Sequence, residues 1–198
     1  MAAGIVWNTA TPPVEHEVCD ESTIYRLNDG GMDLDMGNLP SKGWLPELAP
    51  LFRDKEERKA YACIRVKVIE KAETTGAEIK IKKNRFCELV KPGMYLSDGT
   101  NVITVKSVDT SNEGYDLITA TENLKTAIEA GTVLPEAKSS SEAEAKHVAN
   151  FASFGWRKLD DERTVAFVGR VFGILEDDLY IPFTDEDKAA LGDRFMFI

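Results

Sequence analysis

Apolar and polar residues alternate with a period of two through much of the middle of the chain. The alternation is clear in residues 61–70, 78–82, 102–108 and 115–121. A side-chain period of two is typical of strands with one buried and one solvated face. Residues 164–175 are apolar at both alternating positions. This run predicts a central strand covered on both sides, or a strand at a subunit interface.

Turn signals separate these segments. In the first strand Arg65 and Lys67 alternate with the apolar residues, so we expect both on the solvent face. Glycine-containing turns are predicted at residues 73–77, 91–93 and 97–99, and the last of these holds an Asp-Gly pair typical of hairpins. The spacing of strands and turns favours a small barrel or sandwich.

Two short stretches predict helices instead. Residues 122–130 carry apolar side chains at helical spacing, and Gly131 follows where a helix would end. Thr184 and Asp187 form the pattern of a capping box, which predicts a short helix closed by Gly192. Residues 195–198 are apolar and are expected to add a strand or fill a pocket, in this chain or in a partner.

The first 52 residues show neither period. They contain five of the eight prolines and two of the three tryptophans, together with many large apolar residues. Proline interrupts regular elements, yet so much apolar surface is not expected to remain in water. The combination predicts an extended arm that lies across its own domain or a neighbouring subunit. Such an arm should be removable without unfolding the β core.

The predicted fold is therefore mainly β: a small β-barrel or sandwich-like domain with two short helices, preceded by an extended Pro-rich N-terminal arm. We place the arm at residues 1–58 and the β-rich domain at residues 59–198. Residues 138–147 are rich in Ser, Glu and Ala and are expected to form a flexible loop.

Charge narrows the range of partners. The net charge of −10 disfavours nucleic acid, because binding to phosphates needs a basic surface. The charge is uneven, since residues 53–91 hold twelve basic and seven acidic side chains between two acidic ends. This basic middle could complement another copy in head-to-tail packing or form solvated strand faces, and we favour the second. No apolar run approaches the roughly 18 residues of a membrane helix, so no membrane partner is expected.

Candidate chemistry is sparse. Cys19, Cys63 and Cys87 are far apart and form neither a metal pattern nor a disulfide framework, so each is interpreted as a small buried apolar group. His16 and His147 have no nucleophile at a telling spacing. The acidic, glycine-rich residues 29–38 lack the ligand order of a calcium loop. We therefore predict no catalytic residue, no metal and no cofactor.

Three segments carry a resemblance to a known family. They are residues 6–31 of the arm, residues 79–134 of the β core, and the C-terminal residues 191–198. In these the chain resembles the head-fibre and capsid-decoration (auxiliary capsid) proteins of tailed bacteriophages. The resemblance implies a non-enzymatic virion protein on the outer capsid surface, made in the host cytoplasm. Because the chain is short and lacks a shaft of repeats, a decoration, auxiliary or fibre-base role is favoured.

The resemblance also implies partners. They would be the major capsid protein or other virion proteins, with a homo-oligomer, favoured as a trimer. Large apolar residues of the arm and the C-terminus are the candidate interface residues, because aromatic anchors dominate interface energetics. They are Trp7, Trp44, Leu48, Phe52, Phe195 and Phe197. For each of them, packing on the chain's own core is the alternative.

A second function stays open. Tyr95, Tyr115 and Trp156 are aromatic residues that could form a binding module for glycan or protein on the host surface, in a fibre or tail. A small hydrolase or metal-dependent enzyme is the least favoured hypothesis.

Overall fold

The structure, a computed structural model of the 198-residue chain, describes residues 14–159 and 164–198. Strands dominate it, which confirms the mainly β prediction. The strands are β1 (Tyr25–Arg26), β2 (Met32–Asp35), β3 (Trp44–Leu45), β4 (Pro50–Asp54), β5 (Lys59–Ala62), β6 (Arg65–Lys67), β7 (Glu78–Lys82), β8 (Tyr95–Ser97), β9 (Val102–Asp109), β10 (Tyr115–Ala120), β11 (Val133–Pro135), β12 (Phe151–Ser153), β13 (Arg157–Lys158), β14 (Thr164–Val165), β15 (Phe167–Ile174) and β16 (Phe195–Phe197). The helical elements are α1 (Asp185–Leu191) and the 3-10 turns η1 (Glu21–Thr23), η2 (Glu176–Asp178) and η3 (Gly192–Arg194).

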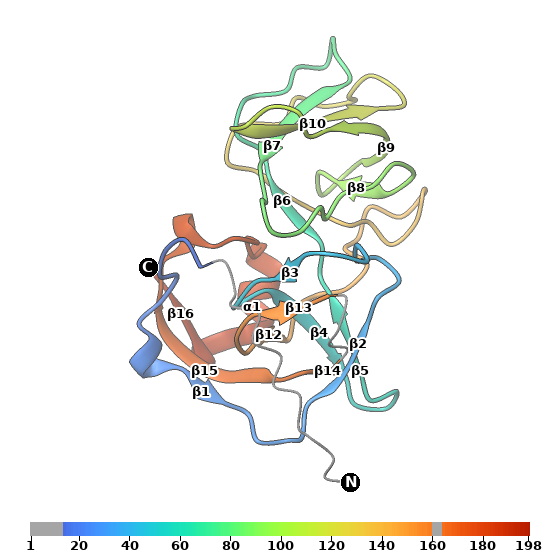
Figure 1. The fold of residues 1–198 in the computed structure, drawn as a ribbon. Coiled ribbons are helices and arrows are strands. Elements are labelled where there is room, and N and C mark those ends of the chain that lie inside the picture. Colours follow the sequence, from blue (N-terminus) through green and yellow to red (C-terminus); the bar gives the residue numbers. More distant parts are fainter. Residues whose placement is uncertain (1–13, 160–163) are drawn as a thin grey trace, which may run out of the picture.

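The strands form two lobes (Figure 1). Strands β6 to β11, within residues 65–137, make an upper lobe with a four-stranded sheet in the order β7-β10-β9-β8 and a β11-β6 pair. The other described residues form the base lobe, so the upper lobe is inserted between β5 and β12. The base sheet runs β1-β15-β12-β4-β5-β2-β14, and β16 pairs with β15. Because β14 continues through Ala166 into β15, this sheet curls back on itself as a half-barrel.

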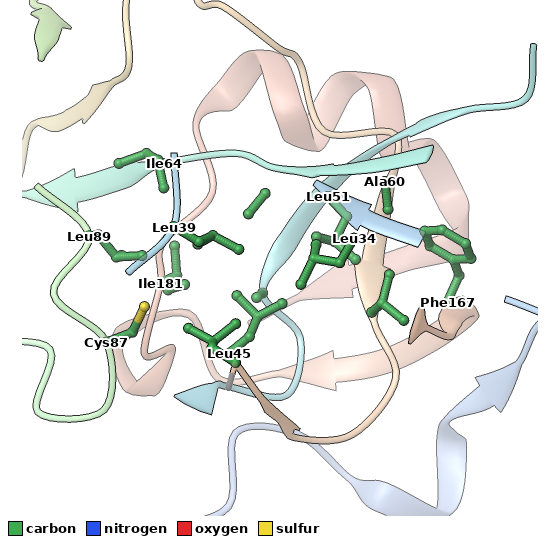
Figure 2. Close-up of a cluster of buried hydrophobic side chains, with 14 residues drawn as sticks. Leu34, Leu39, Leu45, Leu51, Ala60, Ile64, Cys87, Leu89, Phe167 and Ile181 are labelled. Atoms are coloured by element: carbon green, nitrogen blue, oxygen red, sulfur yellow. The ribbon is translucent and has the colours of Figure 1, made fainter. Parts of the chain in front are cut away.

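Three groups of buried side chains support the lobes. One fills the inside of the curled base sheet, where Leu34, Leu51 and Phe167 point toward one another (Figure 2). Cys87 and Leu89, from the chain between β7 and β8, close this cluster and pack the two lobes together. A second cluster belongs to the upper lobe alone. A third lies on the opposite face of β12 and β15, beneath α1 and β16.

The N-terminal segment differs from the expected extended arm. From residue 14 on, it provides η1 and strands β1 to β4, and β4 pairs with both β5 and β12. The expected boundary at residue 58 falls in the turn that joins the paired strands β4 and β5. Residues 1–13, including Trp7, lie outside the described residues. The described part of the segment is therefore integral to the base sheet.

One of the two predicted helices is confirmed. Helix α1 begins at the Thr184 N-cap, and the capping box is complete: Thr184 Oγ1 accepts from Asp187 N–H, and the Asp187 carboxylate accepts from Thr184 N–H. The prediction for residues 122–130 is wrong. There Ile128 forms a two-way backbone bridge with Ala72, and Leu124 N–H donates to Gly76. Leu124 and Ile128 both lie in the core of the upper lobe, although no helix forms there.

Gly43 is required where the lobes approach each other. Its φ is +111°, and a Cβ at this position would lie 2.4 Å from the Phe86 carbonyl oxygen, which also accepts the Trp44 N–H. Gly43→Ala combines an unfavourable backbone conformation with a steric overlap. We expect a loss of about 2–5 kcal/mol in the free energy of unfolding. Chemical denaturation would measure it, with Gly99→Ala as a control at positive φ with open space; equal losses would contradict the steric part.

Candidate interface surface

A buried ion pair joins the two lobes at the base of β6. Arg65 donates from Nε and Nη2 to the two carboxylate oxygens of Asp187, at 2.8 and 2.9 Å. It also donates to the carbonyl oxygens of Ile64 and His147. Arg65 is 1% exposed, so its expected place on the solvent face is wrong. Arg65 lies where the chain leaves the base lobe, and His147 and Ala149, which bond to the pair, lie where the chain returns to the base lobe.

Asp187 is held ionised by its partners. Burial acts to raise the pKa of the Asp187 carboxyl, but hydrogen bonds and charge from Arg65, with the N–H groups of Ala149 and Thr184, outweigh burial and lower it. A lowered pKa in the folded state stabilises the fold above the unfolded-state pKa of about 3.9. This stabilisation is lost as the pH falls through the folded-state pKa.

Stability should therefore fall in acid more steeply for the natural chain than for a variant without this pair. We expect Asp187→Asn to be the less stable protein at pH 7 and to lose less of its remaining stability between about pH 5 and pH 2. Urea unfolding across this range would measure both slopes. Parallel slopes would contradict a distinct contribution from Asp187.

The basic middle of the chain is largely neutralised within the chain. Seven of its twelve basic residues form ion pairs with described carboxylates: Arg53, Arg65, Lys67, Lys71, Lys80, Lys83 and Arg85. Lys67 pairs with Asp177 at 2.9 Å. Lys82, a further basic residue of this segment, donates to the Asp177 carbonyl oxygen, so two basic side chains connect the upper lobe to η2. Lys55, Arg58 and Lys59, at the turn between β4 and β5, remain exposed and form no ion pair with a described carboxylate.

A groove of about 980 Å³ lies between the upper lobe and α1. Phe183 is among the apolar residues that line it. Its charged lining residues are Asp98, Lys138, Glu142, Glu144, Glu176, Asp185, Glu186 and Lys188. Carboxylates outnumber ammonium groups six to two, so the groove disfavours phosphate-rich ligands.

The exposed apolar residues gather at another place. Six large hydrophobic side chains are exposed among the described residues, and four of them belong to one side of the base lobe: Tyr25, Leu175, Met196 and Ile198. Strands β1 and β16 both pair with β15, and the three lie together at the left edge of the base lobe in Figure 1. Together with Arg170 and Phe172 we call these four residues the β15 face. The β15 face is therefore the candidate interaction surface of the described residues.

Alternation and bulges explain why the β15 face is apolar. Phe195 and Phe197 point into the third cluster, so Met196 and Ile198 must point outward. On β15 a register shift beside Gly169 turns Arg170 outward, and Gly173 at φ +70° accompanies a second shift. The sequence predicts only the alternation of side chains between the two faces of a strand. The bulges depend on how β15 pairs with β1 and β16.

A hollow of about 560 Å³ lies at one end of the β15 face. Gly173 leaves it open, since a Cβ there would meet only the Cβ of Asp20, at 3.9 Å. Leu175 and Ile198 form its apolar wall. Glu17, Asp20 and Glu21 form an acidic rim.

The predicted interface residues are placed mostly in the core. Leu48 and Phe195 are buried in the third cluster, and Phe52 and Phe197 pack against it. Trp44 is half-buried in β3. The structure thus brings four of the six together around the chain's own α1 and β15, and their part in an interface stays a prediction.

The three cysteines and His147 are packed among other side chains. The three cysteines are buried and free, and burial raises the pKa of each thiol to about 12, which makes them poor nucleophiles. The His147 ring stacks against Phe52 and Tyr61, and burial lowers its pKa. Within residues 14–159 and 164–198 no cluster of three or more His, Cys, Asp or Glu side chains could hold a metal. In the same residues no helix is long and apolar enough to cross a membrane.

Comparison with known proteins identifies the class. The family model described as head fiber protein matches residues 15–197, which include both lobes. The chain therefore belongs to the head fiber protein family and is a structural protein of the phage virion that associates with other virion proteins. No curated protein matches the chain, and neither does a solved structure.

Proposed function

We propose that this chain binds the outer surface of a phage capsid without enzymatic activity, as a decoration, auxiliary or fibre-base protein in homo-oligomeric form. The proposal rests on the family match, which includes nearly every described residue of both lobes. The major capsid protein is the expected partner, and synthesis in the host cytoplasm is the expected source.

The exposed features of the molecule support a binding role. The β15 face is apolar and aromatic at its centre and charged at its edges, which is the composition of protein interfaces. By contrast, two of the three aromatic residues considered for host binding are engaged within the chain. Trp156 packs edge-on against Phe86 and Tyr180, and Lys80 lies over the Tyr115 ring.

Head binding can be tested with purified components. Phage heads assembled without this protein would be mixed with the purified chain and sedimented, and whole virions would be labelled with gold-tagged antibody. We expect the chain to sediment with heads to a saturable ratio and the label to cover the head. Labelling confined to the tail, or no sedimentation with heads, would overturn the capsid role.

A further inference from the structure

We infer that the β15 face binds residues 1–13 of a neighbouring copy of this chain, with the ring of Trp7 in the hollow beside Gly173. The inference rests on the proposed homo-oligomeric form and names the contact that holds the copies together. Residues 1–13 lie outside the described residues, but the surface that receives them is described, and its composition indicates what it can bind.

The β15 face needs an apolar occupant. Tyr25 is 56% exposed, Leu175 37%, Met196 50% and Ile198 69%. Apart from these four, the exposed large hydrophobic residues within residues 14–159 and 164–198 are Val14, where the described chain begins, and Ile69 in the upper lobe. Elsewhere, the described surface of a second copy therefore offers no matching apolar patch. Contact between two β15 faces would make a two-fold pair, whereas the expected trimer needs two different surfaces in each copy.

Residues 1–13 have the composition that the β15 face lacks in a partner. They contain no charged side chain and place Ile5, Val6 and Trp7 in succession. The other part of the chain outside the described residues, residues 160–163, is charged at every position and is no apolar occupant. Two copies with a net charge of −10 each repel at long range, so an uncharged segment is better suited to join them than most of the surface.

The hollow suits an indole ring. Its volume of about 560 Å³ is within the range of about 300–1,000 Å³ typical of pockets that bind small ligands. Leu175 and Ile198 provide an apolar wall for the ring, and the indole N–H can donate to a carboxylate of the acidic rim, such as that of Glu17 or Glu21. An aromatic residue that is apolar along its ring and polar at its tip is a common interface anchor.

The start of the described chain leads away from its own hollow. Val18 lies beside the hollow, because the Leu175 N–H donates to its carbonyl oxygen. Toward the N-terminus the chain continues to Tyr180, whose hydroxyl accepts from the N–H groups of Glu15 and His16 and whose ring stacks on His16. Residues 14–16 are thereby held beside Tyr180 rather than beside Leu175.

The sequence before Val14 favours a neighbouring copy as the receiver. Thr11 and Pro12 each precede a proline, which favours extended chain and opposes a turn back to the same hollow. Over the seven residues from Val14 to Trp7 an extended chain reaches about 23–25 Å. Each copy then gives its segment to one neighbour and receives a segment from another. A contact between two different surfaces can close into a ring, which is compatible with a trimer.

Disulfide cross-linking tests which copy receives the segment. Asn8→Cys combined with Glu21→Cys places one thiol next to Trp7 and the other at the rim of the hollow, while the three natural cysteines are buried. After mild oxidation, non-reducing gel electrophoresis should show links between copies, up to a trimer. An equimolar mixture of the two single variants should give linked pairs only, and each single variant alone should give none. Asn8→Cys with Lys125→Cys, on the upper lobe, is the control that should not link.

Sedimentation equilibrium tests whether the contact drives assembly. Trp7→Ser and Leu175→Asp should each weaken self-association at least about tenfold, because each removes an anchor or its pocket. Thr9→Ser in the same segment and Ile69→Asp, which is also 37% exposed, should not. A mixture of Trp7→Ser and Leu175→Asp should form pairs but no closed ring, since only one of the two directions of binding remains. Circular dichroism would establish that every variant is folded.

The possible failures are distinguishable. A link within single copies would place the segment on its own hollow and overturn the inference. An oligomeric natural chain without the Asn8–Glu21 link, or a Trp7→Ser variant that assembles like the natural chain, would also overturn it and leave the homo-oligomer standing. A natural chain that stays monomeric at high concentration would refute both the contact and the oligomeric form. Capsid binding is measured separately, by sedimentation with heads.

Discussion

Replacing Arg65 with alanine should lower the free energy of unfolding by about 3–5 kcal/mol. Arg65 is 1% exposed and Asp187 is fully buried, so the variant would leave a carboxylate in the protein interior with only backbone N–H partners. It would also leave the carbonyl oxygens of Ile64 and His147 without this donor. Urea unfolding followed by circular dichroism at pH 7 would measure the loss.

A surface ion pair of equal length provides the control. Lys67 and Asp177 are 2.9 Å apart, but Asp177 is 94% exposed, so Lys67→Ala should cost less than about 1 kcal/mol. Replacing both members of the buried pair with apolar residues, as in Arg65→Met with Asp187→Leu, should cost less than Arg65→Ala, because no unpaired charge remains. Similar losses for Arg65→Ala and Lys67→Ala would show that burial of the pair is unimportant.

Local patterns were sufficient for the strands and for one helix. The period of two at residues 78–82 and 115–121 is β7 and β10, and the capping box at Thr184 opens α1. Such patterns record contacts within a few residues, so sequence can reveal them. The helix prediction for residues 122–130 is wrong because the bridge between Ile128 and Ala72 is a long-range contact that no local period records.

Burial was harder to predict than secondary structure. Arg65 reads as a solvent-facing strand residue, but its partner Asp187 is 122 positions away. The same limit affects the candidate interface. The sequence prediction names Phe195 as an interface residue, yet Phe195 is buried while its neighbour Met196 is exposed, and only the packing of β16 on β15 decides between them. An Asp in a capping box with a distant Arg in a strand is too common a pattern to signal such a pair.

Deleting residues 1–52 should unfold the base lobe rather than remove a separable arm. The deletion removes β1 to β3 and most of β4, which leaves β5 without β2 and β12 without β4. It also removes five buried leucines: Leu34, Leu39, Leu45, Leu48 and Leu51. At about 1.5–3 kcal/mol each, their burial stabilises the fold by about 8–15 kcal/mol, which is comparable to the whole stability of a typical domain.

The upper lobe should respond differently. Its core has no member before Val66, so the truncated chain should keep dispersed amide resonances for residues within 66–134 and lose them for β12 and β15. Heteronuclear NMR spectra of the full and truncated chains would show this directly. Deleting residues 1–13 is the control, since it leaves every described residue in place, and that chain should keep the dispersed resonances of β12 and β15. Dispersed resonances from β15 after deletion of residues 1–52 would mean that the base lobe folds without β1 to β4, and the N-terminal segment would then be an arm as its composition suggests.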